Sequence, residues 1–246
     1  MGRSGLALEP ICLMTTLFDH DYKALVIGAG GAIGRAFTAA FQDDPKCSAV
    51  QTLSRSHAGG FDLNYPQSIE QGAAALADLG PYHVIVDATG ALTVGGVGPE
   101  KSLSALHADH LLRAFQLNTI GPALVLKHFV PLLAPGPSVY AKLSARVGSI
   151  SDNHKGGWYG YRASKAALNM VLQTAAIELQ RKNPQLRVVA LQPGTVRSAL
   201  SAPFAAGVAT LLEPSESVAG MLCALKGLQA RQGAYFMDYK GEEIPW

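Results

Sequence analysis

Apolar residues occur along the chain in short unbroken runs that alternate with stretches of helical spacing. Unbroken runs of this length are typical of strands that are covered on both faces of a parallel sheet. Strands are therefore predicted at residues 23–28, 48–53, 61–63, 82–87, 138–143, 186–191 and 234–237. Helices are expected directly after the first strand and at residues 66–79, 103–133, 158–181 and 214–228.

The alternation of strands and helices predicts an α/β fold with a parallel sheet, in which ligands bind beyond the carboxyl ends of the strands. A length of 246 residues fits one large core and one domain. We expect this domain at residues 23–246. Residues 1–22 are expected to be an extension, poorly ordered at its start, and Met14 is a candidate second start site.

The composition and net charge limit the classes of molecule that the chain is expected to bind. Apolar residues make up 48% of the chain and charged residues 15%, and the net charge is only +2. No basic run is present, so neither nucleic acid nor a membrane is an expected partner, and a small molecule is. The three cysteines are widely separated and lack metal-ligand spacing, and no signal peptide is recognised, which predicts reduced thiols and a cytoplasmic location.

A glycine-rich turn joins the first strand to the helix that follows it. Gly28, Gly30, Gly31 and Gly34 would let backbone amides at the helix N-terminus approach a pyrophosphate. The spacing fits either Gly28-x-x-Gly31-x-x-Gly34 or a G-x-x-x-G-x-G pattern with Ala32 in the middle place. Both interpretations predict a dinucleotide.

The second strand ends in Ser54-Arg55-Ser56, where an NAD site would usually place an acidic residue. Arg55 suits a 2′-phosphate, because a guanidinium pairs with phosphate oxygens through two hydrogen bonds. NADP(H) is therefore predicted. Asp62 is a candidate partner of the adenine amino group, and Ala88-Thr89-Gly90 ends a buried strand where a cofactor would pass.

Tyr161 and Lys165 are four residues apart in an alanine-rich stretch that predicts a helix. Side chains at this spacing leave one face. A lysine ammonium beside a phenol stabilises the phenolate, so the pKa of Tyr161 is expected to fall toward neutrality, as general acid/base chemistry on a carbonyl or alcohol requires.

Asn118 lies within the predicted helix at 103–133, where its amide either bonds locally or opens the backbone to hold a water. His107 and His110 are expected to be solvated side chains, and no metal is predicted. Residues 198–212 suit a mobile substrate lid or a packed surface loop.

Together, the glycine turn, Asn118, the Ser144 region, the Y-R-A-S-K stretch at 161–165 and the P-G-T-V-R-S stretch at 193–198 resemble the short-chain dehydrogenase/reductase family. The resemblance covers nearly all of residues 23–246. S-A-R-V-G-S-I-S-D-N followed by G-G-W-Y-G-Y-R-A-S-K-A-A-L-N is similar to the carbonyl-reductase-like branch that includes the C-factor cell-signalling proteins.

The resemblance implies a single doubly wound Rossmann-type domain with a mainly parallel, seven-stranded sheet, and hydride transfer to or from a nicotinamide. It implies that Tyr161 exchanges the proton, that Lys165 binds the ribose hydroxyls and lowers the pKa of Tyr161, and that Asn118 positions a water. The predicted cofactor-binding residues are Gly28, Gly30, Gly31, Ala32, Ile33, Gly34, Ser54, Arg55, Asp62, Ala88, Thr89, Gly90, Tyr161, Lys165, Pro193, Gly194 and Val196.

The chain departs from the family pattern at the serine that would hydrogen-bond the substrate oxygen. Family members usually read S-S-x-x-G, whereas this chain has Ala145 in the second place. Ser144 is the predicted replacement, with Ser149 as the alternative. The usual N-N-A-G also reads D-A-T-G at residues 87–90.

The resemblance therefore predicts an NADP(H)-dependent oxidoreductase that acts on a small, apolar carbonyl or alcohol. Enoyl reduction is disfavoured, because it usually needs a longer spacing between tyrosine and lysine. The alternative is an NADP(H)-binding regulatory or signalling protein without turnover, which Ala145 favours. The family's helices around Asn118 and Tyr161 also imply a homodimer or homotetramer.

Overall fold

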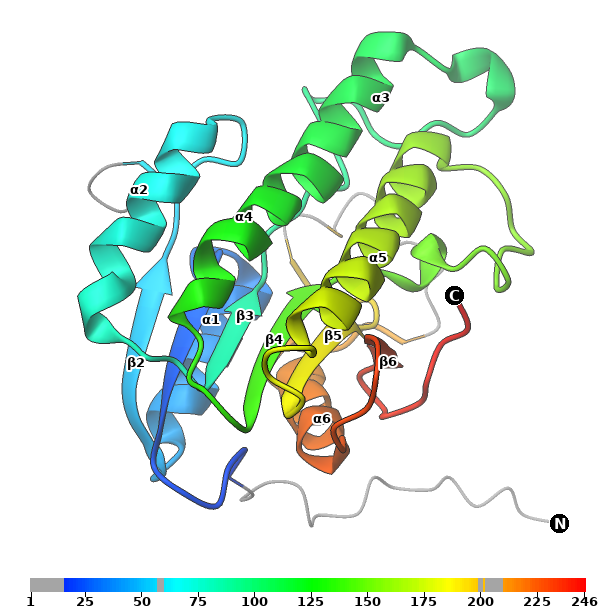
Figure 1. Cartoon of the computed structure of the whole chain (residues 1–246). Coiled ribbons are helices and arrows are strands. Elements are labelled where there is room, and N and C mark those ends of the chain that lie inside the picture. The colour runs from blue at the N-terminus through cyan, green and yellow to red at the C-terminus, as the bar shows by residue number, and fades with distance from the viewer. Residues whose placement is uncertain (1–15, 57–59, 199–200, 202–209) are drawn as a thin grey trace, which may run out of the picture.

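The structure is a computed structural model that describes residues 16–56, 60–198, 201 and 210–246. Its centre is a parallel sheet of six strands in the order β2-β1-β3-β4-β5-β6 (Figure 1). The strands are β1 (Tyr22–Ile27), β2 (Cys47–Leu53), β3 (Val84–Asp87), β4 (Ser138–Leu143), β5 (Leu186–Gln192) and β6 (Tyr235–Asp238). The α/β class, the Rossmann-type arrangement and the parallel sheet predicted from the sequence are confirmed.

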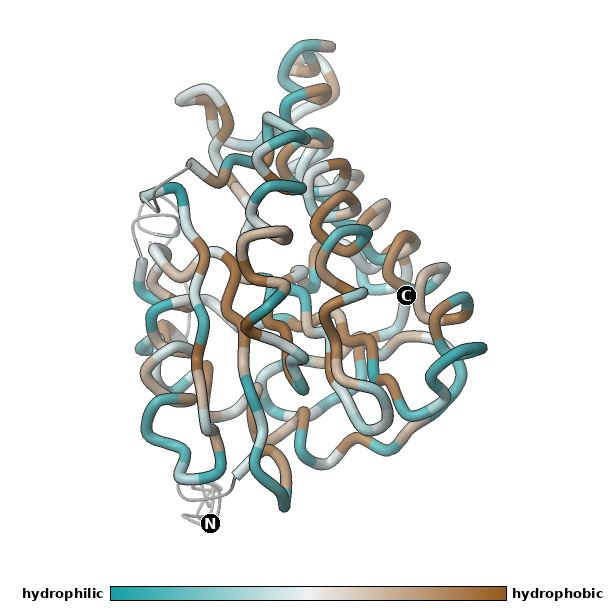
Figure 2. The backbone as a smooth tube through the Cα atoms, turned by 60° about the vertical axis from the view of Figure 1, so that its left-hand side comes forward, coloured by the Kyte–Doolittle hydropathy of each residue, from teal (hydrophilic) through white to brown (hydrophobic). Residues whose placement is uncertain are grey.

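Helices cover both faces of the sheet, so the central strands are buried on both sides. One face carries α2 (Pro66–Leu76), α4 (Gly121–Phe129) and α5 (Tyr159–Leu179), and the other carries α1 (Ala32–Asp43) and α6 (Pro214–Gly227). Along β1, Leu25 and Ile27 pack toward the first face, and Ala24 and Val26 pack toward the second. This period of two explains why the strands have unbroken apolar runs. Figure 2 shows these runs as brown stretches in the interior of the molecule.

The sheet has one strand fewer, within the described residues, than the seven that were predicted. The missing strand is the one expected at residues 61–63, which form no strand. The amide of Asp62 donates to Ser68 Oγ at 3.0 Å, and its carbonyl accepts from the Tyr65 amide at 3.1 Å. Because local bonds occupy both backbone groups, the segment forms a turn before α2 instead of extending the sheet.

The long helical stretch predicted at 103–133 is an interrupted helix. Its main part comprises α3 (Ala108–Phe115), a π-helical segment labelled η4 (Gln116–Ile120) and α4. Pro122 has no N–H with which to bond the carbonyl of Asn118 four residues earlier, so the regular helical ladder cannot continue through this region. Short 3₁₀ turns lie at η2 (Ala77–Leu79), η3 (Leu103–Ala105), η5 (Val130–Leu132) and η6 (Arg146–Gly148).

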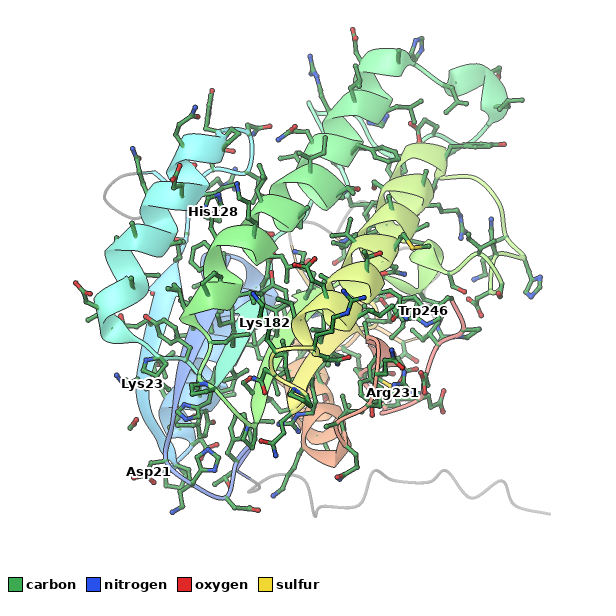
Figure 3. The ribbon with its side chains drawn as sticks, viewed as in Figure 1. Asp21, Lys23, His128, Lys182, Arg231 and Trp246 are labelled. Atoms are coloured by element: carbon green, nitrogen blue, oxygen red, sulfur yellow. The ribbon has the colours of Figure 1, made fainter. Side chains whose placement is uncertain are left out.

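The C-terminal segment packs against the domain. The Trp246 ring stacks on Phe236 of β6 at 5.3 Å between centroids, and Ile244 is buried. Arg231 pairs with Glu243 of the same segment, and Figure 3 labels Arg231 and Trp246 beside β6. These contacts hold the C-terminal segment against β6.

Two further features concern the redox state of the cysteines and the length of the helices. Among the described cysteines, Cys47 is a free thiol, whereas Cys223 is disulfide-bonded, so the expectation of reduced thiols is wrong for Cys223. None of the helices in the described ranges is long and apolar enough to cross a membrane.

Candidate functional site

The glycine turn after β1 is shaped by close backbone approaches. Gly28 has a φ of +85°, and a Cβ there would lie 3.0 Å from the carbonyl carbon of Ala88. A Cβ at Gly34 would lie 2.2 Å from the carbonyl oxygen of Gly28. The first turn of α1 therefore sits directly on the end of β1, and the amides of Ala32 and Ile33 begin the helix at the sheet's carboxyl edge.

The predicted 2′-phosphate residues lie next to this turn. Gly30 is near Ser54, since a Cβ built on Gly30 would be 3.6 Å from Ser54 Cβ. Arg55 follows Ser54, is exposed, and makes no ion pair within the part of the chain that the structure describes. Arg35 adds a second guanidinium here, because it donates to the Gly30 carbonyl. Sequence reasoning missed Arg35, although it directly follows Gly34.

Asp62 is placed differently from a free adenine ligand. Its Oδ1 accepts from both the amide and the side chain of Asn64, at 2.9 and 2.8 Å. The carboxylate thus closes the turn before α2, and its contact with adenine stays a prediction.

The Asp87–Thr89 corner contains a buried ion pair that the sequence did not reveal. Lys142 Nζ of β4 lies 2.9 Å from Asp87 Oδ1, and both side chains are fully buried. The same ammonium donates to the Thr89 carbonyl at 2.6 Å and to Thr89 Oγ1 at 2.9 Å. Asp87 Oδ1 also accepts from the Thr89 amide at 2.9 Å. The pair explains D-A-T-G in place of N-N-A-G, because Asp87 and Lys142 are register partners on neighbouring strands.

Lys165, Asn118 and Gly90 converge beyond the carboxyl end of β3. A Cβ built on Gly90 would lie 3.4 Å from both Asn118 Oδ1 and Lys165 Nζ. Asn118 is almost completely buried; its amide exchanges two 2.9 Å hydrogen bonds with the backbone of Ala91, and it donates to Ser164 Oγ. Lys165 Nζ donates to the Leu143 carbonyl at 3.1 Å. Three predicted residues therefore meet at one point.

Burial controls the protonation of both Tyr161 and Lys165. It raises the pKa of Tyr161 to about 12, which is opposite in direction to the predicted fall. Burial and, to a smaller extent, the nearby Lys142 ammonium together lower the pKa of Lys165 to about 7, with Asp87 partly opposing them. Lys165 Nζ lies 5.8 Å from the centroid of the Tyr161 ring. A partly neutral Lys165 stabilises a phenolate less than a fully charged lysine would.

Among the described residues, neither candidate serine hydroxyl forms a hydrogen bond with Tyr161 or Lys165. Ser144 Oγ donates to Asn169 Oδ1 at 2.6 Å, two helical turns beyond Tyr161. Ser149 Oγ donates to the Pro245 carbonyl at 2.5 Å and is held by the C-terminal segment. The position that carries serine in the family has the methyl group of Ala145.

The remaining predicted positions follow β5. Gly194 has a φ of +77°, and the Pro193 carbonyl accepts from Ser217 Oγ at 2.6 Å. Val196 is buried and forms a bridge with Leu212. The predicted lid at 198–212 lies mostly outside the described residues.

Elsewhere in the described ranges, no group of three His, Cys, Asp or Glu side chains is placed to hold a metal ion. His110 pairs with Glu100 at 2.8 Å and its side chain is only 13% exposed, so the expectation of a solvated side chain is wrong for His110. A cavity of about 640 Å³ adjoins this pair, and its lining includes Val94, Glu100, His107 and Arg113 but not Tyr161.

Comparisons with known proteins agree with the motifs. A family model described as enoyl-(acyl carrier protein) reductase matches residues 34–221. The chain is 38% identical to the C-signal of Myxococcus xanthus over 57% of this chain and 80% of that protein. It is 32% identical to 1-hydroxy-2-glutathionyl-2-methyl-3-butene dehydrogenase of Rhodococcus sp. strain AD45, over 76% of this chain and 79% of the relative.

The fold is also shared with solved structures. The NADPH-bound carbonyl reductase from chicken fatty liver has a TM-score of 0.81 at 21% identity, over 92% of this chain and 95% of that one.

Proposed function

Because the chain belongs to the short-chain dehydrogenase/reductase family, we propose that it is an NADP(H)-dependent oxidoreductase acting on a small, apolar carbonyl or alcohol. The observation that carries this proposal is the meeting of Lys165 and Asn118 at Gly90, with Tyr161 one turn from Lys165 on α5. This meeting requires three segments that are far apart in the sequence, namely the residues after β3, η4 and α5.

The predicted cofactor-binding residues support NADP(H) as the cofactor. The glycine turn lacks side chains where backbone amides must approach a pyrophosphate. Ser54 and Arg55 lie beside Gly30 at the end of β2, where the 2′-phosphate of the adenosine would be recognised. The Lys142 ammonium donates to both the carbonyl and the hydroxyl of Thr89, and these bonds fix the 88–90 segment.

When bound, the nicotinamide would supply or accept the hydride. Tyr161 would donate the proton to the carbonyl oxygen during reduction. A pKa of about 12 keeps its hydroxyl protonated at neutral pH, so the proton is present for donation, but it also makes the phenol a weaker acid than one whose pKa lies near working pH. Lys165 would bind ribose hydroxyls. The carbonyl of Asn118, which lacks the amide of Pro122 as a helical donor, would hold a water on the proton path toward Lys165.

The spacing of Tyr161 and Lys165 favours carbonyl over enoyl reduction, even though the matching family model is described as an enoyl reductase. The two side chains are a single helical turn apart, which places the proton donor close to the ribose-binding lysine. An enoyl thioester is nevertheless a necessary member of any substrate panel.

A second candidate function is a regulatory protein that binds NADP(H) without turnover. It is favoured by the serines, because Ser144 and Ser149 bond to Asn169 and Pro245, and Ala145 offers no hydroxyl. A missing hydrogen-bond donor to the developing oxyanion usually costs about 10²–10³-fold in turnover. That cost slows an enzyme and does not by itself abolish its chemistry.

The test is NADPH oxidation across a panel of aliphatic and aromatic ketones, aldehydes and an enoyl thioester, beside a measurement of NADPH affinity. We expect slow but measurable reduction of a carbonyl. Restoring the family residue in Ala145→Ser should raise kcat by about ten-fold or more. Tight NADPH binding without turnover in both proteins would favour the regulatory function.

A further inference from the structure

Glu100 is a buried carboxylate in the segment between β3 and α3, and its side chain is only 3% exposed. It makes contacts with the residues directly before Tyr161. Its carboxylate accepts from the Gly160 amide at 2.9 Å, and its main-chain carbonyl accepts from the Trp158 amide at 2.5 Å. One residue therefore holds two positions of the segment that begins α5.

The start of α5 needs a partner from elsewhere in the fold. Trp158, its N-cap residue, has a φ of 54° and makes no side-chain capping bond, and the first turn contains no acidic residue. The left-handed conformation is strained for a non-glycine residue and persists only where its surroundings enforce it. Glu100 supplies the missing acceptor, and its negative charge is favourable at a helix N-terminus.

Gly160 shows that the contact is tightly fitted. A Cβ at this position would lie 2.8 Å from Glu100 Oε1 and 3.1 Å from Leu111 Cδ2. Glycine thus allows the carboxylate to reach the backbone of α5. The next residue is Tyr161, and the Trp158 ring meets the Tyr161 ring edge-on at 6.1 Å between centroids.

His110 orients the carboxylate from α3. Its Nδ1 lies 2.8 Å from Glu100 Oε1, and its buried Nε2 has no hydrogen-bond partner among the described residues. Burial tends to raise the pKa of Glu100, but the Gly160 amide and His110 outweigh it and lower that pKa. The carboxylate is therefore ionised near neutral pH, and its contact with His110 links α3 to the start of α5.

The helix that begins with α3 contacts α5 again beyond Tyr161, this time through η4. Thr119 Oγ1 of η4 donates to the Ser164 carbonyl of α5 at 2.7 Å, and Asn118 donates to Ser164 Oγ at 3.3 Å. Tyr161 lies between these two connections. In Figure 1, the chain of α3 and α4 runs beside α5 along this length.

We propose that Glu100, oriented by His110, is a positioning residue that fixes the first turn of α5 and thereby the place of Tyr161. It does not contact the reacting atoms. The catalytic part of this inference rests on the proposed function, whereas the structural part does not. Misplacing a catalytic group by about 1 Å lowers turnover by about 10²-fold, so the effect belongs in kcat.

The variants are Glu100→Ala, which removes the acceptor, and Glu100→Gln, which keeps an oxygen but removes the charge. Asp109→Asn is the matched control, because Asp109 is exposed on α3 next to His110. His110→Phe tests the orientation of the carboxylate, with the exposed His107→Phe as its control. We expect kcat to fall about 10- to 100-fold in Glu100→Ala, and less in Glu100→Gln and His110→Phe, with NADPH affinity unchanged.

A second measurement reports on the segment without turnover. The chain has two tryptophans, so Trp246→Phe leaves Trp158 as the sole tryptophan, whose emission is selected over that of the tyrosines by excitation at the red edge of the absorption band. In that background we expect Glu100→Ala or Glu100→Gln to increase quenching of Trp158 by acrylamide and to weaken its near-ultraviolet circular dichroism. If no carbonyl is reduced by the parent protein, the proposed function fails and this optical measurement alone decides the inference.

Two results would overturn it. One is wild-type optical behaviour in a folded Glu100→Gln protein together with unchanged Trp158 signals in His110→Phe. The other is a kcat in the Glu100 variants equal to that of Asp109→Asn. Loss of thermal stability with unchanged kcat would likewise assign Glu100 a structural role only.

Discussion

Lys165 is close to both Lys142 and Asp87, and its pKa of about 7 makes it the group in the candidate site that titrates nearest to neutrality. Its folded pKa lies below the usual lysine value, so the ammonium is present below about pH 7 and is lost above it. Tyr161, with a pKa of about 12, remains protonated throughout this range.

We therefore predict that kcat/KM for NADPH falls as the pH rises through about 7, because the neutral amine binds the cofactor less well. Lys165→Arg should remove this limb of the profile, since a guanidinium stays charged. Steady-state rates across the neutral and mildly alkaline range would show it. A limb that persists unchanged in Lys165→Arg would assign the titration to another group.

Arg55 is a single residue whose guanidinium is predicted to select NADPH over NADH. Arg55→Ala should weaken NADPH binding about 10- to 100-fold and leave NADH binding nearly unchanged, as expected for a lost charge-assisted contact. Isothermal titration of both cofactors measures this difference. Arg181→Ala, at another exposed arginine, is the control. Equal loss for NADPH and NADH would refute recognition of the 2′-phosphate.

At the scale of elements, the joint between β1 and α1 leaves no room for a side chain at Gly34. A Cβ there would meet the Gly28 carbonyl at 2.2 Å, whereas a Cβ at Gly31 would lie 3.5 Å from the same oxygen. Gly34→Ala should destabilise the protein by about 1–3 kcal/mol or more and displace the turn. Gly31→Ala should be tolerated. Urea unfolding of the two variants tests this, and equal stabilities would contradict the described packing.

The strands show which parts of the fold can be predicted from the sequence. Apolar runs predicted the central strands, because strands covered on both faces leave a local pattern. The segment at 61–63 failed as a strand because Ser68, several residues away, occupies the backbone of Asp62. The buried Lys142 depends on its register with Asp87, and the direction of Ser144 depends on Asn169. Neither the local bond of Asp62 nor the long-range partners of Lys142 and Ser144 leave a periodic signal in a single sequence.

For the whole molecule, exposed apolar side chains lie along the interrupted helix of α3 and η4 and along α5. Leu112, Ile120 and Met170 are 68%, 47% and 66% exposed. Such groups are typical of surfaces that pair between subunits. We predict a homodimer or homotetramer that uses these helices.

Met170→Asp should therefore shift the mass measured by light scattering toward the monomer, because a buried carboxylate would oppose pairing. Leu79→Asp, at an exposed leucine after α2, should keep the mass of the parent protein. A mass that is the same in both variants and the parent would exclude this surface as the interface.

Tyr161 is proposed to supply the proton during hydride transfer. The most direct test is a single-turnover, stopped-flow measurement of NADPH oxidation in Tyr161→Phe, with Tyr159→Phe as the control two residues away. We predict that Tyr161→Phe slows hydride transfer by about 10²–10⁴-fold while NADPH affinity is retained, and that Tyr159→Phe does not. Hydride transfer at the wild-type rate in Tyr161→Phe would contradict the assignment.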